Sequence, residues 1–426
     1  MRCLHKRATL PALAVLACAV FAAGCGDDDS AGEGGFELRI GNVLPFTGDL
    51  APFGPSLDRS ARLAVQEIDA ALRKAGVEGV SVEIVDSQDD ETRPQAGVEA
   101  AKKLVETDDV QVLVGSMASQ VTLAIAESVT IPSGVVMITP TSTAPEITDL
   151  DDDDLVWRVL ASDTLQGSAL ADAVTDAFGD GATVNVGARN DAFGDALKQL
   201  FVREYEANGG QIGANLSWNP EAPNFDSEAQ DLTSGNPDGW VVIDFPETYQ
   251  RFGPALARAG GGWSPDKMLM TEAMRNEESL KEVGPQAAEG LRGTAPTSEG
   301  APAREELDRL FESKASEDEP LTGFEGSSFD SVILAFLAAV KAGSSDPEDI
   351  KENLQAVSGP PGQKYTYLQL DQAIEDLRAG EEIDYEGAWG PIDWTDVGDP
   401  SSAIYEVWRY GDGKIDQLKT FTFGER

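Results

Sequence analysis

The chain has 426 residues, and its 75 acidic residues against 32 basic ones give it a formal charge of −43. Such a charge repels nucleic-acid phosphates, so a nucleic-acid-binding role is excluded. The single His and all three Cys lie within residues 1–25, and the rest of the chain can therefore form no Ser–His–Asp triad, Cys–His dyad, His-ligated metal site or internal disulfide.

Residues 1–24 have the layout of a secretory signal, with a basic head followed by an apolar stretch from Ala8 to Ala23. This stretch is short for a membrane-spanning helix, which needs about 20 residues. It ends at Ala22-Ala23-Gly24-Cys25, which resembles a bacterial lipobox, and the resemblance implies cleavage before Cys25 and lipidation of its thiol. The alternative is an ordinary signal peptide followed by an incidental Cys.

Residues 25–37 are rich in Asp and Gly, and they predict a flexible acidic tether. We therefore expect the protein outside the cytoplasm, held to the bacterial cell membrane by lipid. The longest apolar run after the tether, residues 332–340, is too short to span a bilayer.

From Leu38 onward, short apolar strands alternate with amphipathic helices. The predicted strands are 38–44, 80–85, 110–115, 134–138, 183–187, 211–217, 240–244 and 267–271. The predicted helices include 57–72, 94–106, 120–129, 164–178, 192–201, 303–314 and 327–341. This alternation predicts an α/β fold with parallel sheets covered by helices, and the number of units favours two lobes over one sheet. From Glu381 to the end, the Trp, Tyr, Gly and Asp content favours β-ribbons and turns.

Short segments spread along the chain resemble the leucine/isoleucine/valine-binding proteins, which are extracytoplasmic solute-binding components of ABC importers. The matching segments are Pro45-Phe46-Thr47-Gly48, Leu63-Ala64-Val65-Gln66-Glu67-Ile68, Asp86-Ser87-Gln88-Asp89-Asp90, Val114-Gly115-Ser116-Met117-Ala118-Ser119, Ile138-Thr139-Pro140-Thr141-Ser142-Thr143, Trp157-Arg158, Ser162-Asp163-Thr164-Leu165-Gln166-Gly167 and Asp384-Tyr385-Glu386-Gly387-Ala388-Trp389-Gly390-Pro391-Ile392. Each segment is weak alone, but their order and spacing together are specific.

The resemblance implies the type 1 periplasmic binding protein fold, with two Rossmann-like lobes joined by a three-crossing hinge. Lobe 1 is expected at 38–159 and 298–390, and lobe 2 at 160–297 and 391–426. The implied function is capture of a branched-chain or other hydrophobic amino acid, or a related small amphiphile, and its delivery to the transmembrane permease subunits. No enzymatic activity and no cofactor are implied. The alternatives are a ligand-sensing receptor module of the same fold and a hydrolase that uses carboxylates.

The ligand carboxylate is expected at Ser119, Thr141 and Thr143. Each follows a predicted strand, and α/β ligands sit at the carboxyl ends of strands. The family uses the matching Ser for the ligand carboxylate and the matching Thr positions as ligand contacts. For Ser119 the alternative is a helix cap, and for the two Thr residues it is a polar turn with local hydrogen bonds.

The ligand ammonium is expected at Glu272, which matches the family acid and follows the strand at 267–271. Burying a carboxylate is costly unless a cation accompanies it, although a Glu is usually a solvated surface group. Phe193 occupies the place where many family members carry Tyr before Gly, so the ring remains but the hydroxyl is lost. The alternative for Phe193 is core packing, since it shares a helical stripe with Leu197 and Leu200.

Phe245, Phe329 and Phe53 are weaker ligand candidates, and core packing is the alternative for Phe245 and Phe329. No metal site is predicted. The acidic run Asp151–Asp154 lacks the spacing and the Gly of an EF-hand, so it is read as a solvated loop.

Overall fold

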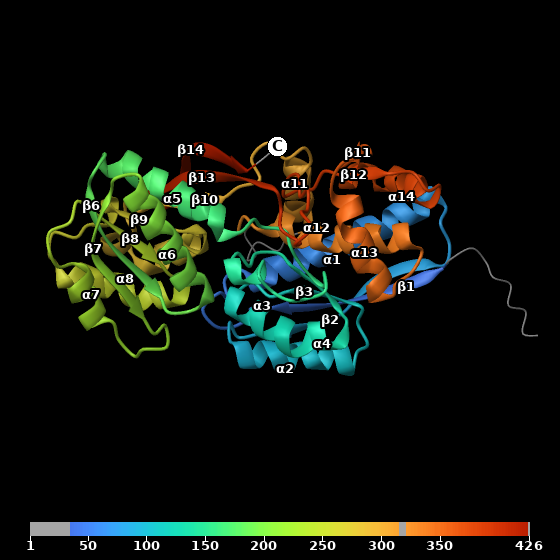
Figure 1. Cartoon of the computed structure of the whole chain (residues 1–426), viewed down its shortest axis with the longest axis horizontal. Coiled ribbons are helices and arrows are strands. Elements are labelled where there is room, and N and C mark those ends of the chain that lie inside the picture. Colours follow the sequence, from blue (N-terminus) through green and yellow to red (C-terminus); the bar gives the residue numbers. More distant parts are fainter. Residues whose placement is uncertain (1–34, 315–320, 425–426) are drawn as a thin grey trace, which may run out of the picture. The chain divides into compact units, whose positions relative to one another are not determined.

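A computed structural model describes residues 35–314 and 321–424 (Figure 1). The signal at 1–24, the lipidation site at Cys25 and most of the tether lie outside these residues. Within them, no single helix is both long and apolar enough to cross a membrane, and one bent pair of helices, 325–342 with 347–358, passes that test of length and composition together.

The first lobe is built on a five-stranded sheet in which every neighbouring pair of strands is parallel. In spatial order the strands are β2 (Val80–Asp89), β1 (Phe36–Leu44), β3 (Val112–Gly115), β4 (Val136–Thr139) and β5 (Val156–Arg158). The helices between them are α1 (Gly54–Ala75), α2 (Pro94–Glu106), α3 (Ser119–Ile125), a π-helical turn (Ala126–Thr130) and α4 (Ile131–Ser133). β3 and β4 are apolar and fully buried, as expected for strands covered on both faces.

The second lobe is built on a seven-stranded sheet. In spatial order its strands are β14 (Lys414–Gly424), β13 (Ser402–Gly411), β10 (Arg292–Pro296), β9 (Met268–Met270), β8 (Gly239–Ile243), β6 (Thr183–Arg189) and β7 (Gln211–Trp218). Its helices are α5 (Asp163–Phe178), α6 (Ala192–Ala207), α7 (Asp226–Leu232), α8 (Pro246–Ala259), α9 (Glu277–Val283) and α10 (Pro285–Ala288). The last two strands form an antiparallel ribbon that extends the parallel sheet through β10.

Between β10 and β13 the chain returns to the first lobe. This segment carries α11 (Arg304–Lys314), α12 (Glu325–Ala342), α13 (Pro347–Ser358), β11 (Gln363–Tyr365), α14 (Leu370–Arg378) and β12 (Ile383–Tyr385). Short 3₁₀ turns lie at Pro145–Ile147, Pro265–Lys267, Glu272–Met274 and Tyr367–Gln369. Every residue from Glu325 to Val340 is buried, and α12 packs on α1, where the Ser328 hydroxyl donates to the Leu57 carbonyl at 2.8 Å.

A buried carboxylate on α12 holds the segment that follows β12. Asp330 accepts hydrogen bonds from the Tyr385 hydroxyl (2.8 Å) and from the backbone N–H groups of Ala388 (3.0 Å) and Trp389 (2.7 Å). A Cβ on Gly387 would come within 2.5 Å of the Asp330 carboxylate, so only Gly fits there. These contacts account for Tyr385 and Gly387 in this segment.

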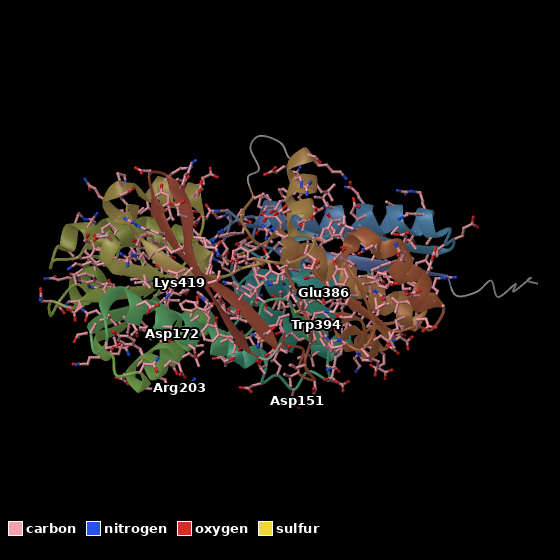
Figure 2. The ribbon with its side chains drawn as sticks, turned by 90° about the horizontal axis from the view of Figure 1, so that it is seen from above. Asp151, Asp172, Arg203, Glu386, Trp394 and Lys419 are labelled. Carbon is pink, nitrogen blue, oxygen red and sulfur yellow. The ribbon has the colours of Figure 1, made fainter. Side chains whose placement is uncertain are left out.

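Figure 2 shows that the C-terminal part of the chain, from Glu386 to Lys419, reaches both lobes. Lys419 on β14 lies over the second lobe with Asp172 and Arg203, whereas Glu386 and Trp394 lie over the first lobe. The α/β fold with parallel sheets in two lobes is confirmed, as is the ribbon near the C-terminus. The helices α13 and α14 lie in a stretch for which no element was predicted.

Candidate functional site

A small buried cavity lies between loops of the two lobes. It has about 20 Å³ of room for the centre of a water-sized sphere, which is space for about one water molecule. Six of the eight predicted ligand residues line it. The lining residues are Leu50, Met117, Ser119, Thr141, Thr143, Leu160, Phe193, Phe245, Glu272, Ala273 and Phe324.

The parallel strands explain why distant residues meet here. Ser119 follows β3 and the two Thr residues follow β4, so the first lobe brings its hydroxyls from neighbouring strand ends. Phe193, Phe245 and Glu272 follow β6, β8 and β9 in the second lobe. The carboxyl ends of parallel strands lie on the same edge of a sheet, which is where α/β folds place ligands.

The Ser119 side chain ties the start of α3 to the loop after β4. Its hydroxyl oxygen accepts the backbone N–H groups of Thr143 and Ala144, both at 3.2 Å. Ser119 is the first residue of α3, and the N-cap position belongs to Ala118. The two bonds of the Ser119 side chain run to the loop after β4, whereas a helix cap would bond to α3 itself. With its oxygen used as an acceptor, the Ser119 O–H remains able to donate to a bound group.

Thr141 and Thr143 are also buried on this loop. The Thr141 hydroxyl donates to the carbonyl of Met117 at 3.2 Å, as the polar-turn alternative expects, and the residue also lines the cavity. The Thr143 carbonyl accepts the backbone N–H of Asp163, the first residue of α5, at 2.8 Å. The loop is thus bonded to α3 on one side and to the start of the second lobe on the other.

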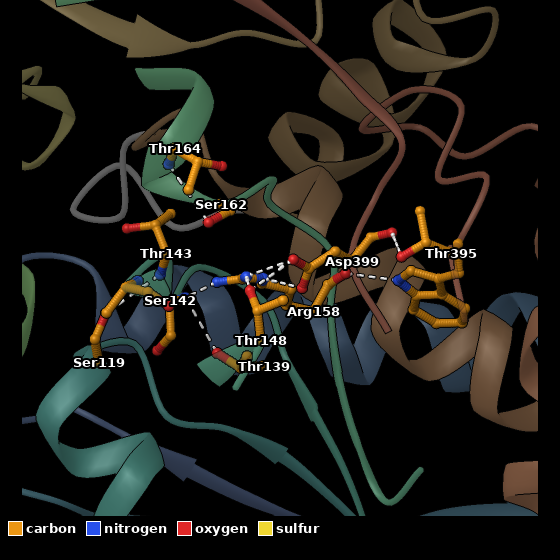
Figure 3. Close-up of polar contacts among 12 residues, drawn as sticks. Ser119, Thr139, Ser142, Thr143, Thr148, Arg158, Ser162, Thr164, Thr395 and Asp399 are labelled. Carbon is orange, nitrogen blue, oxygen red and sulfur yellow. Dashed lines mark hydrogen bonds and ion pairs between the residues drawn. The ribbon is translucent and has the colours of Figure 1, made fainter. Parts of the chain in front are cut away.

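A buried arginine supports this loop from β5 (Figure 3). Arg158 is fully buried; its Nε and Nη2 lie 2.5 and 2.7 Å from the two carboxylate oxygens of Asp399, and its Nη1 donates to the Ala144 carbonyl at 3.0 Å. The Nη2 group also donates to the Thr148 hydroxyl. Two-point pairing fixes the guanidinium plane, so Arg158 fixes the loop carbonyl it contacts.

Glu272 is a buried acid on the cavity wall, in the 3₁₀ turn after β9. Burial raises its pKa to about 7, against the lowering effect of a hydrogen bond donated by the Gln166 side chain. Asp163 is buried nearby, and burial together with the charge on Glu272 raises its pKa well above the usual range, while the Thr143 hydroxyl lowers it. Two buried acids of this kind are stabilised by a cation placed between the lobes.

The second lobe supplies an aromatic wall. The rings of Phe193 and Phe245 stack with their centroids 5.3 Å apart and their planes 19° from parallel. The guanidinium carbon of Arg189 lies 3.7 Å from the centroid of Phe245. Phe193 lines the cavity and also belongs to the buried core beside Leu197, so both interpretations of Phe193 describe its position.

Two of the predicted aromatic residues do not line this cavity. Phe53 is fully buried and packs edge-on against Phe324 at 5.7 Å, one ring behind the wall. Phe329 lies on α12, a helix buried on all sides, and packs against Tyr367 at 4.9 Å. Phe329 thus occupies the position that the core-packing alternative describes, and it is absent from the lining of this cavity.

Several lining or neighbouring residues were not predicted. Phe324 stacks on Trp389 at 5.9 Å and reaches the cavity from the segment before α12. Asp163 and Gln166 lie inside the matching segment at 162–167, and their signal was an acid and an amide one turn apart at the start of a helix. Leu50, Met117 and Leu160 carry no chemical signal, because apolar residues are expected throughout the core.

Comparison with protein families gives one match over most of the chain. The family described as periplasmic binding protein matches residues 37–396.

Relatives of known role are similar over most of their length. A chemotactic signal transduction system substrate-binding protein of Halobacterium salinarum is 25% identical over 399 residues, which cover 92% of this chain and 91% of that protein. A leucine-, isoleucine-, valine-, threonine- and alanine-binding protein of Pseudomonas aeruginosa is 27% identical over 320 residues, or 75% of this chain and 82% of that one. The crystal structure of a leucine binding protein from Thermotoga maritima has the same fold, with a TM-score of 0.73 and 22% identity over 90% of this chain and 98% of that chain.

Proposed function

Because the chain belongs to the periplasmic binding protein family, whose members bind solutes outside the cytoplasm, we propose that it is the solute-binding component of an ABC importer. Its ligand is an amino acid with a hydrophobic side chain, which it delivers to the permease. The observation that carries the ligand class is Glu272, a buried carboxylate on a cavity whose other polar side chains are hydroxyls and whose remaining wall is apolar. The names of the relatives from P. aeruginosa and T. maritima agree with this class.

The binding mechanism follows from the chemistry of each wall. The Ser119 hydroxyl, whose O–H is free to donate, holds the ligand carboxylate, and the hydroxyls of Thr141 and Thr143 join it when they turn from Met117 and Asp163 to the ligand. Glu272, with Asp163 behind it, holds the ammonium. The apolar residues and the Phe193–Phe245 rings cover the ligand side chain. Since the cavity has room for only about one water molecule, an amino acid enters when the lobes move apart, and the lobes then close on it around a cavity wider than this one.

Calorimetry on refolded, ligand-free protein tests the proposal. The panel contains L-leucine, L-isoleucine, L-valine, L-threonine and L-alanine, the amides of these amino acids, and benzoate. Leucine and its relatives bind; the amides keep the ammonium but lose the carboxylate, and benzoate keeps a carboxylate but has no ammonium, so both bind far more weakly. Binding by no member contradicts the substrate class, and tight binding of benzoate alone removes the role of Glu272.

Ligand binding is expected to release a proton. In the ligand-free protein burial raises the pKa of Glu272 to about 7, so the side chain is mostly protonated at pH 6, whereas pairing with an ammonium favours the ionised form. Glu272 therefore contributes close to one released proton per ligand at pH 6 and almost none at pH 8.5, and the affinity falls about tenfold per pH unit below 7. Calorimetry at each pH in buffers of different ionisation enthalpy measures this number. A proton count of zero at pH 6 contradicts the prediction.

The chain is held to the membrane through a lipid on Cys25, which the lipobox-like segment before it supports. A Cys25→Ser variant is expected to move from the membrane fraction to the soluble extracytoplasmic fraction, because one apolar signal stretch alone does not retain a cleaved protein. Immunoblotting of the fractions measures the shift, and mass spectrometry of the N-terminal peptide identifies the lipid. Retention in the membrane fraction of variant chains whose signal has been removed contradicts lipid anchoring; a Cys18→Ser variant is the matched control.

A sensory role is the second candidate, and the relative from H. salinarum favours it by name. The same cleft serves both roles, because only the partner protein differs. Co-purification of the ligand-bound chain with a permease supports transport, whereas co-purification with a membrane receptor supports sensing.

A further inference from the structure

Arg189, the last residue of β6, is a buried arginine surrounded by three carboxylates. Its Nη2 lies 3.0 Å from Oδ2 of Asp49, its Nε pairs with Asp191, and its Nη1 lies 3.8 Å from Oδ1 of Asp244. The same guanidinium covers the ring of Phe245, which lines the ligand cavity. One side chain therefore contacts both the cavity wall and a group of acids.

The three acids come from different parts of the fold. Asp191 caps α6 and Asp244 follows β8, so both belong to the second lobe with Arg189. Asp49 belongs to the first lobe, in the loop between β1 and α1. Its Oδ2 also accepts a hydrogen bond from the hydroxyl of Thr248, in the first turn of α8, at 3.1 Å. One carboxylate of the first lobe thus takes two donors from the second.

This cross-lobe contact lies beside the cavity. Leu50 follows Asp49 directly and lines the cavity, and Phe245 under Arg189 lines it from the second lobe. A Cβ on Gly194 would come within 2.2 Å of the Arg189 carbonyl and 2.6 Å of its Cγ, so Gly at this position leaves room for the arginine. Apart from Asp49, the residues around Arg189 therefore belong to the second lobe.

The charge arrangement lets the contact break without leaving a buried arginine alone. When Asp49 withdraws, Asp191 and Asp244 stay beside Arg189, and the Asp49 side chain, already 20% exposed, passes into water. Removing every partner of a buried charge would be far more costly. Glu247 on α8 works against the contact, because its charge and that of Asp49 repel each other. The contact is thus reversible.

We propose that Asp49, Arg189 and Thr248 form a latch across the ligand cavity. Arg189 is a positioning residue: it holds the Phe245 ring in the wall and, through Asp49, stabilises the closed arrangement of the lobes and lengthens the residence time of the ligand. The effect on residence time rests on the proposed function, whereas the effect on closure does not depend on any ligand.

A distance measurement between the lobes tests closure without ligand. Spin labels are placed at Lys102 on α2 and Gln230 on α7, two exposed positions, in a full chain in which its three Cys are replaced by Ser. The Asp49→Asn variant is expected to shift the distance distribution of the ligand-free protein toward longer values. The control is Asp226→Asn, which removes a charge of the same sign from an exposed pair within the second lobe, Asp226–Arg258, and leaves the distribution unchanged.

Stopped-flow release of L-leucine provides the second readout. Asp49→Asn is expected to release leucine about five-fold faster, with the association rate within about two-fold of the wild type, because the lost pair is partly exposed. Thr248→Val, which removes the other donor and keeps the shape, shifts both readouts the same way by less. An unchanged distance distribution in both variants overturns the latch. If no amino acid binds but Asp49→Asn still opens the lobes, the latch stands and the proposed ligand class fails.

Discussion

The Glu272→Gln variant is expected to bind L-leucine at least about 100-fold more weakly than the wild type. Gln has the same shape but carries no charge, so the ligand ammonium enters a buried site without its direct ionised partner. A hydrogen bond to a charged group contributes about 1.5–3 kcal/mol, and an unpaired buried charge costs about 3–5 kcal/mol. About 2.7 kcal/mol already corresponds to a 100-fold loss of affinity. Calorimetry with leucine measures it.

The same variant should fold at least as well as the wild type, which separates lost binding from misfolding. Burial raises the pKa of Glu272, so the ionised form is disfavoured in the closed fold, and the neutral Gln also removes the repulsion with Asp163. We expect a melting temperature at pH 8 that is unchanged or higher. Glu278→Gln, an exposed change on α9, is the matched control and keeps full affinity. Wild-type affinity in Glu272→Gln contradicts the assignment of the ammonium site.

The Arg158→Gln variant is expected to lose about 3–5 kcal/mol of unfolding free energy. Arg158 is fully buried, and its removal leaves the Asp399 carboxylate, only 13% exposed, without its two-point partner. The Ala144 carbonyl and the Thr148 hydroxyl lose a donor at the same time. A melting temperature lower by about 6 °C or more follows, and thermal unfolding followed by circular dichroism measures it.

The matched control for Arg158→Gln is Arg203→Gln, which breaks an exposed pair with Glu204 and costs at most about 1 kcal/mol. The affinity for leucine, measured at a temperature at which the Arg158→Gln variant is still folded, provides a second readout. Because Arg158 fixes the loop that carries Thr143, the variant is expected to bind leucine more weakly, whereas Arg203→Gln does not. A melting temperature within about 1 °C of the wild type contradicts the role of Arg158.

The parts of the site that follow strands could be predicted from the sequence. The apolar runs before Ser119, Thr141 and Glu272 identify strands, and alternation with helices indicates a parallel sheet. A parallel sheet then places the residues after each strand on one edge. Many polar residues lie at these strand ends. The resemblance of short segments to a known family indicated which of them to consider as ligand contacts.

The residues that the sequence did not reveal depend on tertiary packing. Phe324 follows no strand, and its ring reaches the cavity because Phe53 and Trp389 pack around it. Phe329 was a weaker ligand candidate with core packing as its alternative, and α12, which is buried on all sides, surrounds it with core neighbours. The partners Arg158 and Asp399 are 241 residues apart, and no local pattern connects them.

The ring stack on the second lobe has a consequence for redesigning the ligand range. Phe193 stacks on Phe245, and the guanidinium of Arg189 lies over the Phe245 ring. A smaller residue in place of either ring therefore leaves a gap in a stack that supports a buried charged group. The preference for ligand size is therefore more easily altered at Leu50, Met117 and Leu160, which line the cavity but are not part of this stack. A library restricted to these three positions should yield altered preference for side-chain size while keeping the recognition of the amino acid head group.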